Sequence, residues 1–227
     1  MSQKLTILFD LDGTLVDTAP DLVIAHNHVM KKFGFATKEA NEIKALVGMG
    51  AKTMMSKTLW NAAKEEIKKV TEKDIKDKMV KEFIKFYGEN ILVESKLIKG
   101  AKDFLKWCSK NEISMGVCTN KQEHLAIDLL KKIGINDFFN YVAGSNTFDY
   151  CKPDPRHLTS VIEIIGGDIK KTIMIGDSEV DEKSAHNASL PFILLEGGYT
   201  NVDTSQMKFD HLIKDFTGLN EIIKNYL

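Results

Sequence analysis

The chain of 227 residues carries 31 lysine and arginine side chains against 32 aspartate and glutamate side chains, a formal net charge of −1. This balance argues against a protein that binds nucleic acid or a membrane surface, and no apolar stretch approaches the ~20 residues of a membrane span. Three scattered cysteines without metal-site or disulfide spacing, and an N-terminus unlike a signal peptide, predict a cytoplasmic protein. We expect the protein to be a monomer or a homodimer.

The first predicted element is a buried strand over residues 5–9, which ends on two carboxylates. Asp10 and Asp12, in the stretch ILFDLDGTLVD, are two residues apart and would share one face of an extended chain. Like charges that close are unfavourable unless a cation or a shared proton relieves them. The stretch therefore predicts a cation or a proton beside the two acids, just before the chain turns at Gly13.

Residues 16–94 follow with four helical patterns and no strand run between them. The patterns are APDLVIAHNHVMKKFG, KEANEIKALVG, AKTMMSKTLWNAAKEEIKK and TEKDIKDKMVKEFIKFYGEN. We predict that this region is a small helical bundle, inserted after the first strand. The dense mixture of both charges in its last two patterns is typical of a solvated helix face.

From residue 95 onward, short apolar runs alternate with helical patterns. The runs at 113–118, 141–143, 172–175 and 192–195 are typical of strands buried on both faces. The helical patterns between them include HLAIDLLKKIG and RHLTSVIEIIGG, each closed by glycine. The alternation predicts an α/β fold with a doubly wound, Rossmann-like parallel sheet, built from residues 1–15 and 95–227.

Polar side chains follow four of the predicted strands. In open α/β sheets, ligands bind at the carboxyl ends of the strands, so these side chains are expected to converge. Each one alone has a plainer explanation, such as a helix cap for Thr119 or a surface position for Lys152. The side chains, in chain order, are Asp10 and Asp12, then Thr119 and Asn120, then Lys152, and finally Asp177 and Asp181.

The chemistry of this set favours a metal ion and a phosphate group. The carboxylates of Asp10 and Asp177 suit Mg²⁺, which takes one or two carboxylates besides waters and phosphate oxygens. A lysine, a threonine hydroxyl and free backbone N–H groups suit the oxygens of a phosphate. A carboxylate inside such a cage can attack phosphorus, and a neighbouring acid can protonate the leaving oxygen and then activate water.

Four motifs in this order, DLDGTL, TN, KP and GDSEVD, resemble those of the haloacid dehalogenase-like phosphohydrolase superfamily. The helical insert resembles the cap that this superfamily places between its first and second motifs. FDLDGTLVDTAPDL, VGMGAK and KPDP are similar to the phosphoglycolate phosphatase branch, and the likeness covers nearly the whole chain. The resemblance implies a Mg²⁺-dependent phosphatase that acts on a small phosphorylated metabolite, with 2-phosphoglycolate the leading substrate.

The resemblance also implies a role for each motif residue. Asp10 would be the nucleophile and Asp12 the general acid and base. Gly13, Thr119 and Asn120 would bind the substrate phosphate, and Lys152 would stabilise its charge. Asp10, the backbone carbonyl of Asp12, and Asp177 would hold Mg²⁺, with Asp181 supporting them from behind.

Other functions fit parts of the same pattern. A dehalogenase is disfavoured because family members with that activity lack the second acid, here Asp12. A phosphorylated receiver domain has no helical insert, and its phosphoacceptor follows a middle strand rather than the first. A catalytically silent binding protein remains open, as do a sugar-phosphate phosphatase, a β-phosphoglucomutase-like enzyme, a pyrophosphatase and a phosphonate hydrolase.

The stretch LVGMGAK is the candidate reader of the carboxylate of phosphoglycolate. Gly48 and Gly50 permit close approach of the backbone, and a helix predicted to start near Ala51 would present free N–H groups. Lys52 would add charge if it points inward. The alternative is that these glycines only shape a turn between two helices.

Overall fold

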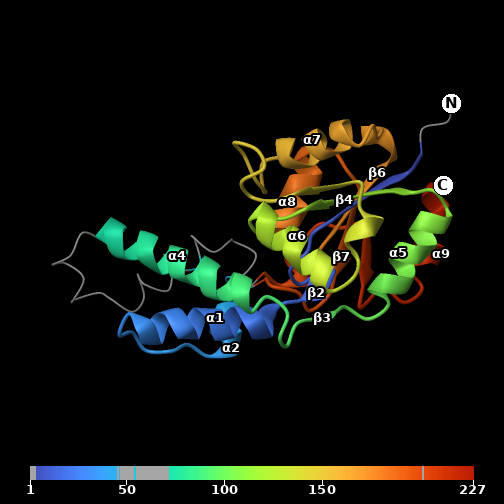
Figure 1. The fold of residues 1–227 in the computed structure, drawn as a ribbon. Coiled ribbons are helices and arrows are strands. Elements are labelled where there is room, and N and C mark those ends of the chain that lie inside the picture. Colours follow the sequence, from blue (N-terminus) through green and yellow to red (C-terminus); the bar gives the residue numbers. More distant parts are fainter. Residues whose placement is uncertain (1–3, 45, 47–53, 55–71, 201) are drawn as a thin grey trace.

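A computed structural model describes residues 4–44, 46, 54, 72–200 and 202–227. In this part of the chain, a six-stranded parallel sheet forms the centre of the fold (Figure 1). The strands, in spatial order, are β5 (Tyr141–Ala143), β4 (Ser114–Cys118), β1 (Thr6–Phe9), β6 (Thr172–Gly176), β7 (Phe192–Leu195) and β8 (His211–Ile213). The first strand of the chain is therefore central, hydrogen-bonded to β4 on one side and β6 on the other.

Helices cover both faces of the sheet. Side chains alternate along each strand, so Ile7 and Phe9 enter one core cluster while Leu8 enters the other. The cluster with Ile7 includes residues of α5 (Ala101–Lys110), α6 (Glu123–Lys132) and α9 (Leu219–Ile223). The cluster with Leu8 includes residues of α7 (Arg156–Ile164) and α8 (Glu179–Asn187). This three-layer arrangement confirms the predicted doubly wound sheet.

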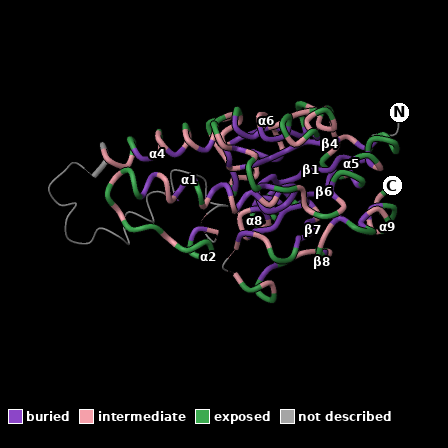
Figure 2. The backbone as a smooth tube through the Cα atoms, turned by 60° about the horizontal axis from the view of Figure 1, so that its bottom comes forward, coloured by how far each residue is buried: buried purple, intermediate pink, exposed green. Residues whose placement is uncertain are grey.

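Short 3₁₀ helices complete the connections, at Asn136–Phe138, Ile169–Lys171, Thr204–Gln206 and Lys224–Tyr226. Figure 2 shows the inner strands β4, β1, β6 and β7 as a largely buried centre within more exposed helices. None of the helices among the described residues is long and apolar enough to cross a membrane.

Three helices extend to one side of the sheet in both overall views: α1 (Ala19–Lys32), α2 (Ala40–Lys44) and α4 (Glu72–Glu89) (Figures 1 and 2). α1 packs against both of the others. His28 of α1 stacks on Phe86 of α4 with ring centroids 3.8 Å apart, and its Nε2 lies 3.0 Å from Glu82. Of the predicted helix over 38–48, the structure describes Ala40–Lys44 as helical, and residues 45, 47 and 48 lie outside the described residues. The predicted helix over 51–69 also lies outside them, except for Met54.

The chain enters and leaves this helical region side by side. β2 (Val16–Asp17) pairs antiparallel with β3 (Lys96–Leu97), a ribbon too short to be predicted from the sequence. The Asp21 carboxylate ties the outgoing chain to the start of α1. It accepts hydrogen bonds from the N–H groups of Val93 (3.0 Å), Glu94 (2.9 Å) and Ser95 (3.0 Å) and from the Ser95 hydroxyl (2.6 Å). A cap domain with boundaries at 15/16 and 94/95 stays a prediction, and both boundaries fall at this junction.

Candidate active site

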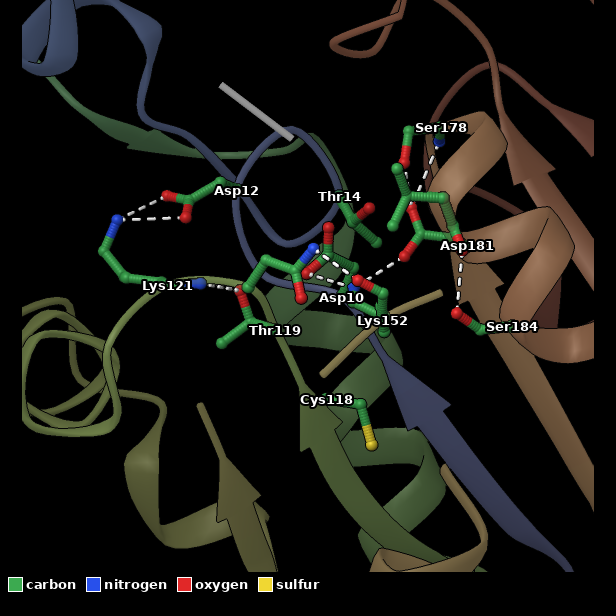
Figure 3. Close-up of polar contacts among 12 residues, drawn as sticks. Asp10, Asp12, Thr14, Cys118, Thr119, Lys121, Lys152, Ser178, Asp181 and Ser184 are labelled. Atoms are coloured by element: carbon green, nitrogen blue, oxygen red, sulfur yellow. Dashed lines mark hydrogen bonds and ion pairs between the residues drawn. The ribbon is translucent and has the colours of Figure 1, made fainter. Parts of the chain in front are cut away.

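Asp10 lies at the carboxyl end of β1, in the middle of the sheet. Its backbone N–H donates to the carbonyl of Ile175 at 3.0 Å, which continues the ladder with β6 by one residue. The side chain is buried. Figure 3 shows that residues from four separate connections surround it, as expected from the shared edge of a parallel sheet.

Lys152, from the loop before α7, makes the central ion pairs of the site. Its Nζ lies 2.9 Å from Asp10 Oδ1 and 2.6 Å from Asp181 Oδ1, and its side chain is 2% exposed. Burial alone would lower the pKa of Lys152, but the two carboxylates outweigh this effect and raise the pKa above its ordinary value. The lysine is therefore a fixed positive charge beside Asp10, not a surface residue.

Asp181 is held by the first turn of α8. Its Oδ2 accepts hydrogen bonds from the hydroxyl (2.6 Å) and N–H (3.1 Å) of Ser178, which is the N-cap residue of the helix. Its other oxygen faces Lys152. The side chain thus caps the helix and at the same time positions the lysine.

Asp177 is fixed from two sides between β6 and α8. The Thr14 hydroxyl donates to its Oδ1 at 2.7 Å, and the Tyr199 N–H donates to its Oδ2 at 2.6 Å. Gly13 and Gly198 pack so closely on this carboxylate that a Cβ at either position would overlap it. Gly13 also needs its left-handed φ of 86°, and its N–H donates to the Val16 carbonyl within the turn.

The donor set fits a divalent cation. Carboxylate oxygens of Asp10, Asp177 and Asp181 lie within 4.8 Å of one another, and all three residues are buried. Burial and the neighbouring acids raise the pKa of Asp10 and of Asp177, against the opposing effect of Lys152 on Asp10. Three ionised acids and one ammonium sum to −2, which a Mg²⁺ ion would neutralise with the hard oxygen ligands that it prefers.

Asp12 has a different partner from Asp10. Lys121 Nζ lies 2.7 Å from Asp12 Oδ1 and 3.0 Å from Oδ2, and the Thr18 hydroxyl donates to Oδ1 at 2.6 Å. The structure places a positive charge beside each of the two acids, and a metal ion shared between them stays a prediction. Each carboxylate has an ammonium group of its own, since Lys121 lies beside Asp12 and Lys152 beside Asp10 (Figure 3).

The motif after β4 lies against both lysines. Thr119 is buried, and its Oγ1 accepts the N–H of Lys121 at 3.1 Å, which leaves the hydroxyl proton available for donation. The Asn120 side-chain amide donates to the carbonyl of Lys152 at 3.0 Å. Gly13, Thr119 and Asn120 are thus brought to the site, and their contact with a substrate stays a prediction.

Sequence reasoning missed Lys121, the most consequential of the further residues at the site. Its side chain is 5% exposed, and its Nζ lies 4.5 Å from the centre of the Tyr87 ring, on α4. The one available signal was its position directly after Thr119 and Asn120.

Thr14, Thr18, Ser178 and Tyr199 were also missed, although the first two belong to the same stretch as the acids. Gly48, Gly50, Ala51 and Lys52 lie outside the described residues.

The chain is similar to several known proteins over nearly its whole length. A relative from Agrobacterium fabrum (strain C58), named phosphoglycolate phosphatase, is 40% identical over 93% of this chain and 89% of its own length. A protein of the same name from Mesorhizobium japonicum is 33% identical over 94% of this chain and 92% of its own length. A crystal structure titled as a predicted phosphoglycolate phosphatase from Haemophilus somnus 129pt superposes with a TM-score of 0.91 at 30% identity, covering 98% of this chain and 99% of the other.

A model of the family described as haloacid dehalogenase-like hydrolase matches residues 7–195, which is most of the chain and includes Asp10, Asp12, Thr119, Lys152 and Asp177. The resemblance carried by the four motifs is thereby confirmed, and this protein belongs to the haloacid dehalogenase-like hydrolase family.

Proposed function

We propose that the protein hydrolyses 2-phosphoglycolate through an aspartyl-phosphate on Asp10, with Mg²⁺ as cofactor. The observation that carries this proposal is the buried carboxylate of Asp10, which faces the Lys152 ammonium at 2.9 Å within a cluster of further acids. The two relatives named phosphoglycolate phosphatase support the choice of substrate. The free thiols of all three cysteines fit a reducing compartment, so we place the enzyme in the cytoplasm.

The first step forms a bond between an Asp10 oxygen and phosphorus as the ester bond to the leaving oxygen breaks. Lys152 and the Thr119 hydroxyl offset the charge on the phosphoryl oxygens. Asp12 gives its proton to the leaving oxygen. In the second step Asp12 takes a proton from a water that attacks phosphorus, which releases inorganic phosphate and restores Asp10.

Asp10, Asp177 and the backbone carbonyl of Asp12 would hold Mg²⁺, and Asp181 would act through Lys152 and the α8 turn. When bound, the ion would offset the negative charge that the phosphate adds to this acidic cluster. The Thr14 hydroxyl and the Tyr199 N–H hold the Asp177 carboxylate in its orientation through hydrogen bonds that do not involve the ion. Asp181 keeps Lys152 pointed at Asp10.

The covalent step is tested with two variants. Asp10→Asn preserves shape but removes the attacking charge, and we expect kcat to fall on the order of 10⁴-fold or more. Asp12→Asn blocks the second step, while p-nitrophenyl phosphate, whose leaving group needs no proton, still reacts in the first. We expect one equivalent of nitrophenol to be released rapidly, and one phosphoryl group per chain to appear in the intact mass. Turnover by Asp10→Asn would refute the proposed nucleophile.

Metal dependence is tested by replacing Mg²⁺ after chelation. Mg²⁺ requires near-octahedral geometry at about 2.0–2.1 Å, whereas Ca²⁺ takes more ligands at about 2.3–2.6 Å. We expect Mg²⁺ to restore phosphoglycolate hydrolysis and Ca²⁺ to restore little, because the larger ion would draw Asp10 out of line with phosphorus. Full activity in excess chelator would contradict the proposed donor set, and a preference for hexose phosphates would contradict the substrate.

A further inference from the structure

Lys121 is a buried cation that the two chemical steps do not use. Burial alone would lower the pKa of this lysine, yet Asp12 and then Tyr87 raise it above its ordinary value, so the side chain keeps its charge. A buried charge is costly unless it is paired. Asp12 supplies that pairing in this structure, but Asp12 must also exchange a proton with the leaving group during the reaction.

Lys121 lies beside Asp12, away from the acids Asp10 and Asp181 that pair with Lys152. Its Nζ contacts both oxygens of Asp12, at 2.7 and 3.0 Å, whereas Lys152 contacts Asp10 and Asp181 (Figure 3). An acid that protonates the leaving oxygen lies within about 2.6–3.2 Å of it. A group attached to that oxygen through a single methylene is therefore within reach of the Lys121 ammonium.

We propose that Lys121 binds the second anionic group of the substrate, the carboxylate attached through one methylene to the ester oxygen. This inference rests on the proposed function and deepens it, because it assigns substrate selectivity to a core residue. An ammonium has three N–H donors, and Asp12 accepts no more than two of them here. The remaining donor faces Tyr87, and a substrate carboxylate would accept it without breaking both contacts with Asp12.

Tyr87 links this cation to the helical region. The Tyr87 ring is almost fully buried, and Lys121 Nζ lies 4.5 Å from its centroid, a cation–π distance. Lys121 leaves the loop after β4, whereas Tyr87 comes from α4, so the orientation of the ammonium depends on the helical region as well as the core. A cation held in one place favours esters whose second anionic group lies at a fixed distance from the phosphate. Esters without a second anionic group, and esters with a longer spacer before it, would be disfavoured.

The test compares 2-phosphoglycolate with ethyl phosphate, which has the same length but ends in a methyl group. We expect Lys121→Met to lower the ratio of kcat/KM for the two esters on the order of 100-fold, mostly through KM for phosphoglycolate. Lys121→Arg, which keeps the charge, should retain most of the ratio. Lys131→Met, at an exposed lysine in the last turn of the following helix α6, should leave it unchanged.

A binding measurement separates this proposal from the proposed function. Calorimetry with Mg²⁺ compares 3-phosphonopropionate, in which methylene replaces the ester oxygen of phosphoglycolate, with propylphosphonate, which lacks the carboxylate. Wild type should prefer the first, and Lys121→Met should lose that preference. If folded Lys121→Met loses kcat/KM equally for both esters and affinity equally for both phosphonates, the proposal is overturned. Lys121 would then be a positioning residue for Asp12. If wild type hydrolyses neither ester, the proposed function fails while calorimetry still decides the role of Lys121.

Discussion

Replacing Asp21 by alanine tests the junction where the chain enters and leaves the helical region. The carboxylate accepts four hydrogen bonds from residues 93–95, more than 70 positions along the chain. Val93 and Glu94 are exposed, so water replaces the lost acceptor for their N–H groups. Ser95 is buried, and its N–H and hydroxyl would both lose the carboxylate that they share.

The expected magnitude follows from these two buried donors. A buried donor left without a partner costs about 1–3 kcal/mol, so we expect Asp21→Ala to lower the free energy of unfolding by roughly 3 kcal/mol. If the opening is local, the Ser95 amide should exchange with solvent on the order of 100-fold faster, since each 1.4 kcal/mol is about tenfold. Asp103→Ala is the matched control, because this exposed acid only pairs with Lys106 at the surface.

The same carboxylate has a defined pH dependence. Burial alone would raise the pKa of Asp21, but hydrogen bonds from the Ser95 hydroxyl and from three backbone N–H groups outweigh it and hold the pKa below its usual range. Its stabilising contribution is therefore complete above the unfolded pKa of ~3.9 and is lost as pH falls through the folded value. Urea unfolding of the wild type and of Asp21→Ala, each at neutral and at acidic pH, measures this contribution as the difference between their free energies of unfolding. Equal unfolding free energies at neutral pH, with unchanged exchange at Ser95, would refute this account of the junction.

Two further predictions concern the core around the site. Gly198→Ala places a Cβ on the Asp177 carboxylate. We therefore expect at least a roughly tenfold loss of kcat/KM, and weaker activation by Mg²⁺ in a metal titration of the folded variant. Unchanged activation by Mg²⁺ would show that Asp177 need not hold this position. Burial and then Lys152 lower the pKa of His157 to about 4. The free energy of unfolding should fall by about 3 kcal/mol as pH drops from ~6.5 to 4, because the unfolded histidine binds its proton first; a similar fall in His157→Gln would contradict this assignment.

The sheet and the converging strand ends could be predicted because each depends on local pattern. Apolar runs predicted the four inner strands and the edge strand β5 within one residue at either end. Parallel strands place their carboxyl ends at the same edge of the sheet, independently of the loops that connect them. The edge strand β8 was missed because it spans three residues, one of them the exposed Leu212, between charged neighbours. Such a segment has no apolar run that distinguishes it from a loop.

The burial of Lys121 could not be predicted for a different reason. A lysine after a polar pair is usually solvated, and nothing local marks this one as buried. Its burial depends on Tyr87, 34 positions earlier, and on Asp12, 109 positions earlier. Contacts at that separation come from tertiary structure, which a single sequence pattern does not contain. The same limit applies to Tyr199, whose N–H and hydroxyl contact Asp177 and Asp17.

The central position of β1 sets an order for folding during synthesis. β1 is made before either of its neighbours, and the second of these, β6, begins only at Thr172. A nascent chain that stops short of this point can pair β1 with β4 but leaves the other edge of β1 with unpaired N–H and C=O groups. Exposed strand edges of this kind recruit other chains. Ribosome-stalled chains released before residue 172 should therefore aggregate, whereas chains that extend past β6 and β7 should remain dispersed.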